Sequence, residues 1–225
     1  MSIIMKTVDL CRTFNTGFEE VHALKSINIE IEEGKLTILR GKSGSGKTTL
    51  INLLATMDDP TSGEIYLENE EISKCSQEEK NNLRKSKIGV CFQSGALLSS
   101  LTALENVEFA LRVTKFPKSS RKNHAEEYLG LVGLRNRMHQ YPYELSGGES
   151  QRVAIARTLA CSPKIIFMDE PTSALDSTTA LKIVKILKEL VHNQKCTIVM
   201  TTHDPNMIEI ADNVYTLSDG VILNA

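Results

Sequence analysis

Hydrophobic and polar residues along this chain follow two periods, and each period predicts a different kind of element. In residues 24–32, three isoleucines alternate with polar residues, which is the period of two that a half-exposed strand shows. Residues 165–168 and 197–202 lack this alternation and are rich in apolar and β-branched residues, as buried parallel strands are. Residues 181–190 instead carry apolar side chains at helical spacing. The pattern therefore predicts an α/β protein.

From end to end, the pattern predicts an antiparallel β region, an α/β core and a helical insertion. Strands are expected at 3–10, 24–32, 36–39, 64–67, 88–92, 165–170, 197–202 and 213–218, and helices at 50–55, 76–87, 104–112, 121–132, 148–160 and 181–190. A polar turn at 15–20 separates the first two strands, and the strand at 213–218 is expected to be the last. The chain, 1–225, is expected to form a single domain. In it, 1–93 and 162–225 form the core with its antiparallel sheet, and 94–161 form a helical subdomain.

Composition narrows the class of protein. With 225 residues, 41% hydrophobic and 24% charged, the chain has the make-up of a soluble globular protein. Its net charge of −2 gives no general attraction to nucleic acid, so no nucleic-acid partner is expected. No apolar run approaches the ~20 residues needed to span a bilayer, and the first residues lack the features of a signal peptide, so a cytoplasmic location is expected. Five widely spaced cysteines without a C-x-x-C pair predict reduced thiols.

The glycine-rich stretch at 41–49 fits the pattern G-x-x-x-x-G-K-[ST] in full. A predicted strand precedes it and a predicted helix follows it, so backbone N–H groups and the positive end of the helix dipole converge on one point. Lys47 can then reach the β- and γ-phosphates of a nucleotide, and the Thr48 hydroxyl can join the coordination of Mg²⁺. The residues predicted to bind the nucleotide here are Gly41, Ser43, Gly44, Ser45, Gly46, Lys47, Thr48 and Thr49.

A second candidate anion site lies at the start of the helix expected at 148–160. Ser146, Gly147 and Gly148 directly precede this helix, where free N–H groups and the helix dipole favour an anion. A plain helix N-terminus, with Ser146 as the cap and Glu149 as the first-turn acid, is the simpler reading. Because a helix start does not require a pair of glycines, we favour the anion site.

Four further polar residues follow predicted strands at the edge where parallel α/β sheets place their ligands. Gln93 follows the strand at 88–92 and either coordinates the metal or the attacking water, or caps a turn. Asp169 and Glu170 end the next buried strand, which predicts Asp169 as a ligand of the Mg²⁺ water shell and Glu170 as the group that polarises a water. His203 follows the strand at 197–202 and is placed to contact a γ-phosphate. Convergence of these edges predicts that Lys47, Gln93, Glu170 and His203 carry the catalysis, with Thr48, Gln93 and Asp169 at the metal.

Taken together and in this order, these residues resemble the nucleotide-binding subunit of an ATP-binding-cassette (ABC) transporter, and the resemblance covers the whole chain. It rests on the phosphate loop at 41–48, Gln93, the signature Leu145-Ser146-Gly147-Gly148-Glu149, the acidic strand, the loop Ser173-Ala174-Leu175-Asp176 and His203. The resemblance implies a RecA-like P-loop NTPase core with a small antiparallel β subdomain and an inserted α-helical subdomain. It also implies ATP hydrolysis with Mg²⁺, with Glu170 as general base, Gln93 as the switch-loop glutamine and His203 as the γ-phosphate switch.

The resemblance further implies partners. Two chains would form a head-to-tail homodimer, in which ATP on one phosphate loop is covered by Ser146, Gly147 and Gly148 of the other chain. Phe14 stands where the family usually carries a tyrosine, so it becomes a platform for the adenine ring, although packing is the alternative for an isolated phenylalanine. The apolar run formed by Leu97, Leu98 and Leu101, close to Gln93, is expected to receive a short cytoplasmic helix of an integral-membrane permease subunit; packing of the helical subdomain is its alternative. This would hold the chain at the inner face of the cell membrane.

The subgroup rests on weaker signals. Val21-His22-Ala23-Leu24, Leu97-Leu98, residues 101–107 and residues 146–159 are similar to bacterial ATPases for lipoprotein release, macrolide export and antimicrobial-peptide resistance. The pair Ser173-Ala174 departs from several of these relatives and is shared with amino-acid importer ATPases, which are the alternative.

A soluble cassette ATPase acting on DNA or ribosomes would be expected to contain a long coiled coil or a second cassette. A phosphate-loop kinase or GTPase would leave Ser146-Gly147-Gly148 unexplained.

Overall fold

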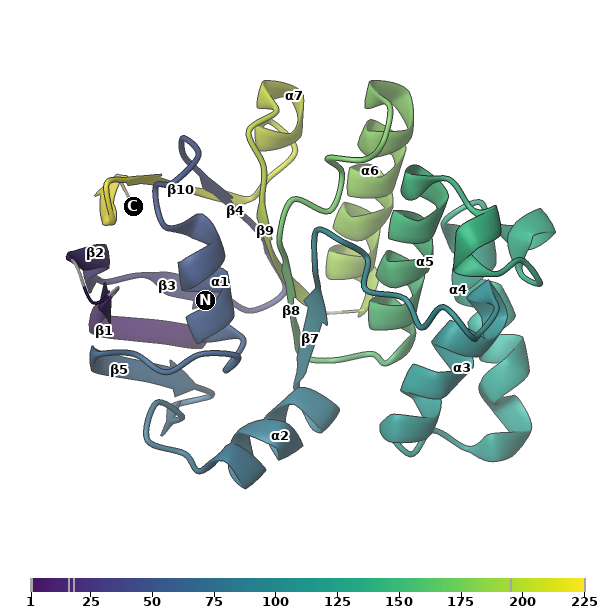
Figure 1. Cartoon of the computed structure of the whole chain (residues 1–225), viewed down its shortest axis with the longest axis horizontal. Coiled ribbons are helices and arrows are strands. Elements are labelled where there is room, and N and C mark those ends of the chain that lie inside the picture. The colour runs from purple at the N-terminus through teal and green to yellow at the C-terminus, as the bar shows by residue number, and fades with distance from the viewer. Residues whose placement is uncertain (1, 16, 18, 195, 225) are drawn as a thin grey trace.

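A computed structural model describes residues 2–15, 17, 19–194 and 196–224. Within these residues, a six-stranded sheet runs through the middle of the molecule (Figure 1). Its order is β11 (Val221–Asn224), β10 (Asn213–Ser218), β4 (Leu36–Arg40), β9 (Thr197–Thr201), β8 (Ile165–Met168) and β7 (Ile88–Cys91). The five strands from β10 to β7 are parallel, and β11 is antiparallel to β10. The carboxyl ends of the parallel strands therefore share one edge.

The N-terminal part of the chain builds a smaller antiparallel sheet. Its order is β2 (Glu20–Ile27), β1 (Ile3–Asn15), β5 (Ser62–Leu67) and β6 (Glu70–Glu71), and β3 (Glu30–Glu32) also pairs with β1. The predicted strand at 24–32 is thus divided between β2 and β3, which pair with different parts of β1. The alternation still predicted the buried face correctly, since all three isoleucines are buried. The polar turn predicted at 15–20 includes Thr16 and Phe18, which lie outside the described residues.

The large sheet has an apolar layer on each face. Along β8, Ile165 and Phe167 pack with α1 (Lys47–Leu54), whereas Ile166 and Met168 pack with α5 (Gly147–Ala160) and α6 (Ser177–Gln194). Successive side chains of a strand point to opposite faces, so the continuous apolar run of β8 is what a strand covered on both sides requires. Figure 1 shows α1 and the small sheet on one side of the large sheet, and α5 and α6 on the other.

The segment expected to be helical contains α3 (Ala103–Val113), α4 (Arg121–Leu131) and α5, with short 3₁₀ turns at Lys118–Ser120, Arg135–Arg137 and Pro142–Glu144. Thr102 and Ser146 each cap the following helix and form a capping box with a glutamate three residues on. Two helices lie outside this segment besides α1 and α6, namely α2 (Gln77–Ser86) and the short α7 (Pro205–Ile208). Among the described residues, no helix is both long and apolar enough to cross a membrane. The division into 1–93 with 162–225 and 94–161 remains a prediction.

The prediction was wrong about the end of the chain. The strand at 213–218 is not the last, because Asp219 and Gly220, both with positive φ, turn the chain back into β11. The helix after the phosphate loop also begins earlier than predicted, at Lys47 rather than at residue 50. Its early start brings Lys47 and Thr48 into the first helical turn, so their backbone N–H groups lie at the positive end of the helix dipole.

Candidate functional site

The phosphate loop joins β4 to α1 and depends on glycine for its shape. Gly46 is the N-cap of α1 with φ of 104°, and a Cβ there would lie 2.6 Å from the carbonyl oxygen of Ala23. Only glycine combines this left-handed φ with such a close approach of backbone. The Lys47 ammonium donates hydrogen bonds to the carbonyl oxygens of Gly41, at 2.8 Å, and Lys42, at 3.0 Å. The lysine therefore folds back over its own loop and adds positive charge where the backbone N–H groups gather.

A hollow of about 550 Å³ opens beside this loop, and we call it the phosphate-loop hollow. Its size lies within the range of small-molecule sites. Its walls come from β2, from the phosphate loop, from the ends of β7 and β8, and from the turn between β10 and β11. Among the predicted nucleotide-binding residues, those that line it are Ser43, Gly44, Gly46, Lys47, Thr48 and Thr49.

Two predicted phosphate-loop residues lie behind this hollow. A Cβ on Gly41 would lie 2.2 Å from the carbonyl oxygen of Leu217, so this glycine allows the loop to pack against β10. Ser45 is 5% exposed, and its carbonyl oxygen accepts a hydrogen bond from the backbone N–H of Gly220. The structure therefore gives Gly41 and Ser45 a part in supporting the loop from behind.

The predicted metal-binding residues Thr48 and Asp169 are brought together. The Thr48 hydroxyl donates a hydrogen bond to Asp169 Oδ2 at 2.8 Å, and the Thr201 hydroxyl donates to Asp169 Oδ1 at 2.7 Å. A hydroxyl and a carboxylate are the hard oxygen ligands that Mg²⁺ prefers. Among the described residues, no cluster of three or more His, Cys, Asp or Glu side chains is placed to hold a metal ion. Proteins commonly bind Mg²⁺ through one or two such groups, with water and phosphate oxygens as the other ligands.

Glu170 lies at the same edge in a strained backbone conformation. Its φ is 43°, and its backbone N–H donates to the Thr201 hydroxyl at 2.7 Å. Gln93 Nε2 lies 3.5 Å from Glu170 Oε2, and His203 Nδ1 lies 3.7 Å from Glu170 Oε1. Gln93, Asp169 and Glu170 all line the phosphate-loop hollow, whereas His203 is 75% exposed and does not line it. Sequence reasoning missed Thr201, although a threonine ending a buried strand beside an acidic strand was a usable signal.

The candidate signature lies on the other face of the large sheet. Ser146 is exposed and caps α5 by accepting a hydrogen bond from the Glu149 N–H at 3.2 Å. In return, the Ser146 backbone N–H donates a hydrogen bond to Glu149 Oε2 at 2.9 Å, and this bond lowers the pKa of Glu149. A Cβ on Gly147 would meet nothing within 4 Å, whereas one on Gly148 would lie 3.0 Å from the carbonyl oxygen of Ala174. None of the three signature residues predicted to contact ATP lines the phosphate-loop hollow of this chain.

Phe14 lies in β1 with its side chain 38% exposed. It is paired with Val21 of β2, and Val21 lines the phosphate-loop hollow although Phe14 itself does not. The phenylalanine is therefore adjacent to the hollow, and its role as an adenine platform remains a prediction.

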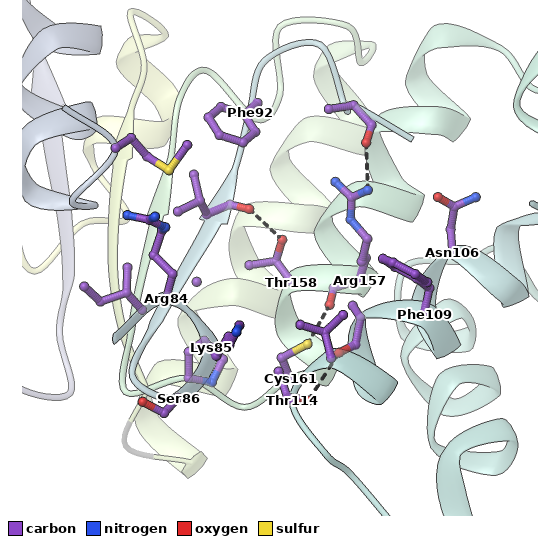
Figure 2. Close-up of a pocket in the computed structure, with 18 of the residues that line it drawn as sticks. Arg84, Lys85, Ser86, Phe92, Asn106, Phe109, Thr114, Arg157, Thr158 and Cys161 are labelled. Carbon is purple, nitrogen blue, oxygen red and sulfur yellow. Dashed lines mark hydrogen bonds between the residues drawn. The ribbon is translucent and has the colours of Figure 1, made fainter. Parts of the chain in front are cut away.

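An apolar groove of about 390 Å³ lies between α2 and α3 (Figure 2), and we call it the α2–α3 groove. Arg84 and Lys85 of α2 stand on one side, and Phe109 of α3 and Arg157 of α5 stand on the other. Of the three leucines predicted at this site, Leu98 lines the groove and is 42% exposed. The other two do not line it: Leu97 packs against the core, and Leu101 is half-buried.

The loop at 92–101 contains Gln93 and continues to the α2–α3 groove. Polar side chains of α3 and α5 hold it in place, and these contacts were not predicted from the sequence. Gln151 Nε2 donates to the carbonyl oxygen of Phe92 at 3.2 Å, and the Arg157 guanidinium donates to those of Gly95 and Ala96 at 2.9 and 2.8 Å. From α3, the Asn106 amide donates to the carbonyl oxygens of Leu98 and Leu101 at 3.1 and 3.0 Å. Gln151 and Arg157 belong to α5, so the signature helix is bonded directly to the loop that carries Gln93.

Comparisons with known proteins agree with this geometry. Residues 24–173 match the family described as ABC transporter. The chain is 42% identical over 221 residues to an uncharacterized ABC transporter ATP-binding protein, MJ1508, of Methanocaldococcus jannaschii, covering 98% of both chains. It is 40% identical over 215 residues to the macrolide export ATP-binding/permease protein MacB of Bartonella henselae, covering 96% of this chain and 32% of MacB.

A solved structure is also similar. It is the dimeric structure of a post-hydrolysis state of the ATP-binding cassette MJ0796 of M. jannaschii, bound to ADP and Pi. This chain superposes on it with a TM-score of 0.93 at 39% identity, covering 98% of this chain and 97% of that one. The P-loop NTPase fold and the ATPase class predicted from the sequence are confirmed. The chain belongs to the ABC transporter family, among its ATP-binding proteins.

Proposed function

We propose that this chain binds and hydrolyses Mg-ATP and thereby powers a separate integral-membrane subunit. The observation that carries the proposal is the meeting of Thr48, Asp169 and Glu170 beside the phosphate loop, with the first two in hydrogen-bond contact at 2.8 Å. Phosphoryl transfer requires mainly positioned charge and one group that orients the attacking water, and this edge of the sheet supplies both.

The residues divide the chemistry between them. Lys47 and the first turn of α1 bind the β- and γ-phosphates, and Thr48 and Asp169 would hold Mg²⁺, which neutralises phosphate charge when bound. Glu170 accepts the proton of the attacking water, and its position at the end of β8 aims the carboxylate into the phosphate-loop hollow. Gln93 and His203, each close to one carboxylate oxygen of Glu170, orient the water and contact the γ-phosphate.

The signature acts in this proposal on the nucleotide of a second chain. Ser146, Gly147 and Gly148 lie at the N-terminus of α5, on the face of the large sheet opposite α1. One chain therefore does not bring both helix N-termini to the same triphosphate. A head-to-tail homodimer does, and each ATP is then bound by two helix N-termini. The similar MJ0796 structure is named as dimeric, which supports this assembly.

The α2–α3 groove is the proposed contact with the membrane subunit. Its floor is apolar, and Arg84, Lys85 and Arg157 surround it with positive charge. This suits a short amphipathic helix with acidic residues on its polar side. Gln93 lies on the same loop as Leu98, so occupation of the groove is communicated to the γ-phosphate. Through this partner, the chain would be held at the cytoplasmic face of the cell membrane.

Within the family, we favour the subgroup of lipoprotein release, macrolide export and antimicrobial-peptide resistance. The similarity to MacB, which is named a macrolide export ATP-binding/permease protein, supports this choice. The pair Ser173-Ala174 keeps amino-acid importers as the second candidate. Identification of the membrane subunit that purifies with the chain separates the two, because the exporters' partner carries a large extracytoplasmic domain.

Assembly is tested at Ser146 with two substitutions of similar size. Aspartate and asparagine both cap a helix about as well as serine, so both variants should fold. Ser146→Asp places a negative charge against the partner's γ-phosphate, so we expect it to lose nearly all ATPase activity, while Ser146→Asn retains a substantial part. ATP binding by monomeric Ser146→Asp should be unchanged. Equal activities of the two variants, or a specific ATPase activity that stays flat from nanomolar to high micromolar protein, would contradict the shared site.

The groove is tested at Leu98 and controlled at Leu131. Both leucines are about 40% exposed, and Leu131 lies on α4 outside the groove. We expect Leu98→Ser to abolish the change in ATPase rate that the co-purified membrane subunit causes, with unaltered ATP binding by the isolated chain, and Leu131→Ser to leave both unchanged. If Leu98→Ser instead unfolds the chain, the leucine serves the core and the contact is misplaced.

A further inference from the structure

The end of the small sheet nearest the phosphate-loop hollow carries two exposed apolar side chains side by side. Phe14 of β1 and Val21 of β2 are cross-strand partners and are 38% and 42% exposed. Directly paired residues point to the same face of a sheet, so the two form one small apolar surface. Val21 also lines the hollow. A flat apolar surface beside a phosphate-binding loop has the chemistry that stacks on a nucleobase.

Arg12 contacts one member of this surface, the ring of Phe14. Its guanidinium carbon is 4.5 Å from the centroid of the Phe14 ring, which is a cation–π contact. The same guanidinium is 2.8 Å from the carboxylate of Asp58. Its buried Nε meets no acceptor among the described residues. The Arg12 head group thus contacts both the ring of Phe14 and the carboxylate of Asp58.

This arrangement has a consequence for the ring. Phenylalanine has no hydroxyl group with which to anchor itself, so only contacts with its faces and edges can fix its orientation. A cation over one face holds the ring and leaves the other face for a ligand. Ordering the ring before binding lowers the entropy lost when a base stacks on it. Asp58 follows α1 by a few residues, so the ion pair also ties the ring to the helix whose first turn binds phosphate.

We propose that Arg12 is a positioning residue for the adenine base, acting through Phe14. The proposal rests on the proposed function, in which ATP binds the phosphate loop with its base beside Phe14. In this role Arg12 does not touch the nucleotide. It braces the phenylalanine ring from the side opposite the base, and Asp58 holds Arg12 in place.

A purely structural role for the Arg12–Asp58 pair is the competing explanation, and β1 offers a matched control. Lys6, on the same strand, lies 4.9 Å over the ring of Tyr66 of β5. Neither Lys6 nor Tyr66 lines the phosphate-loop hollow. Lys6→Ala therefore removes a comparable contact from the same sheet without touching the surface next to the hollow.

The test compares two ligands that differ by the nucleoside, Mg-ADP and Mg-pyrophosphate, by isothermal titration calorimetry. We expect Arg12→Ala to weaken ADP binding about two- to fivefold, the loss that corresponds to one exposed cation–π contact. Pyrophosphate affinity should stay the same, because the phosphate loop is unaltered. Arg12→Lys should restore most of the ADP affinity, and Lys6→Ala should change neither affinity.

The decisive measurement repeats Arg12→Ala in a Phe14→Ala chain, where it should have no further effect on ADP binding. Equal losses for ADP and pyrophosphate, or a loss that persists without Phe14, would overturn the role of Arg12 and leave the proposed function intact. An unchanged ADP affinity in Phe14→Ala would remove the base platform and the role of Arg12 together. Failure of the unaltered chain to bind either ligand would instead refute the proposed function.

Discussion

Because the backbone at Glu170 is strained, substitutions at this one position can distinguish an effect on catalysis from an effect on stability. Glu170 has φ of 43°, in the left-handed region that costs an ordinary residue about 1–2 kcal/mol. Such strain at a functional site persists when the surroundings fix the backbone, and here Thr201 accepts the N–H of Glu170 while the Glu170 carbonyl accepts that of Ser173. Two uncharged replacements, Glu170→Gln and Glu170→Asn, should therefore behave alike in catalysis and differently in stability.

The size of the difference follows from the backbone. Asparagine is severalfold enriched in the left-handed region, which corresponds to about 0.6–1 kcal/mol relative to glutamine. The contacts that the shorter side chain gives up are long ones, at 3.5 Å to Gln93 and 3.7 Å to His203, and together they contribute at most about 0.5 kcal/mol. The asparagine variant should thus be more stable than the glutamine variant, by up to about 1 kcal/mol. For a domain of this size, 1 kcal/mol corresponds to a rise of about 2–4 °C in Tm.

Both variants should lose turnover, by about 10²- to 10⁴-fold, because neither amide accepts the proton of water. The assays are phosphate release at saturating Mg-ATP and urea unfolding of the protein without nucleotide. Glu189, exposed in α6, provides the control, since Asn is the weaker helix former there and the order of stabilities should reverse. An asparagine variant less stable than the glutamine variant would refute the strain argument, and turnover within threefold of the unaltered chain would refute Glu170 as the base.

Three further predictions concern other parts of the molecule. Gly147→Ala should fold normally, because its Cβ meets nothing, whereas Gly148→Ala must displace the carbonyl of Ala174 at 3.0 Å and should be the less stable of the two in urea unfolding. Hydrogen bonds from two lysines lower the pKa of Glu68, so the stability that Glu68→Gln removes at pH 7 should vanish as the pH falls through that lowered pKa, measured by urea unfolding from pH 7 to 3. Burial raises the pKa of Cys91 to about 12, so iodoacetamide at pH 8 should spare Cys91 in the folded chain and label it after unfolding, as peptide mass spectrometry would show.

Local patterns predicted most of the fold, and what they missed is a short strand and the start of a helix in a glycine-rich stretch. The buried strand at 165–168 and the phosphate loop could be predicted, because the residues within each segment determine its conformation. The last strand, β11, is too short to show a period, although Asp219-Gly220 was a turn signal of the kind that starts hairpins. The start of α1 was placed late because the glycines before it resemble a loop more than a helix.

The candidate site divides in the same way. Positions at the ends of strands could be predicted, because the carboxyl ends of parallel strands meet at one edge; Gln93, Asp169 and Glu170 do line the phosphate-loop hollow. Side chains that act across the fold could not. The contact between Arg12 and Asp58 joins residues 46 positions apart, and that between Arg157 and Gly95 joins residues 62 apart. No local period marks such pairs, since they are created only when separate elements pack.

The anchors of the loop at 92–101 have a bearing on how this scaffold diversifies. Main-chain carbonyl oxygens, which every amino acid possesses, accept the hydrogen bonds that Gln151, Arg157 and Asn106 donate to this loop. Side chains on the outer side of the loop, such as Leu98, are therefore free to be exchanged while these hydrogen bonds remain. If the groove receives a helix of the membrane subunit as proposed, a library randomised at Leu98 and at Phe109 across the groove would change which helix binds, and the hydrogen bonds that hold the loop would stay the same. In this loop, the exposed side chains can vary in sequence, whereas the hydrogen bonds to its main chain keep its conformation constant.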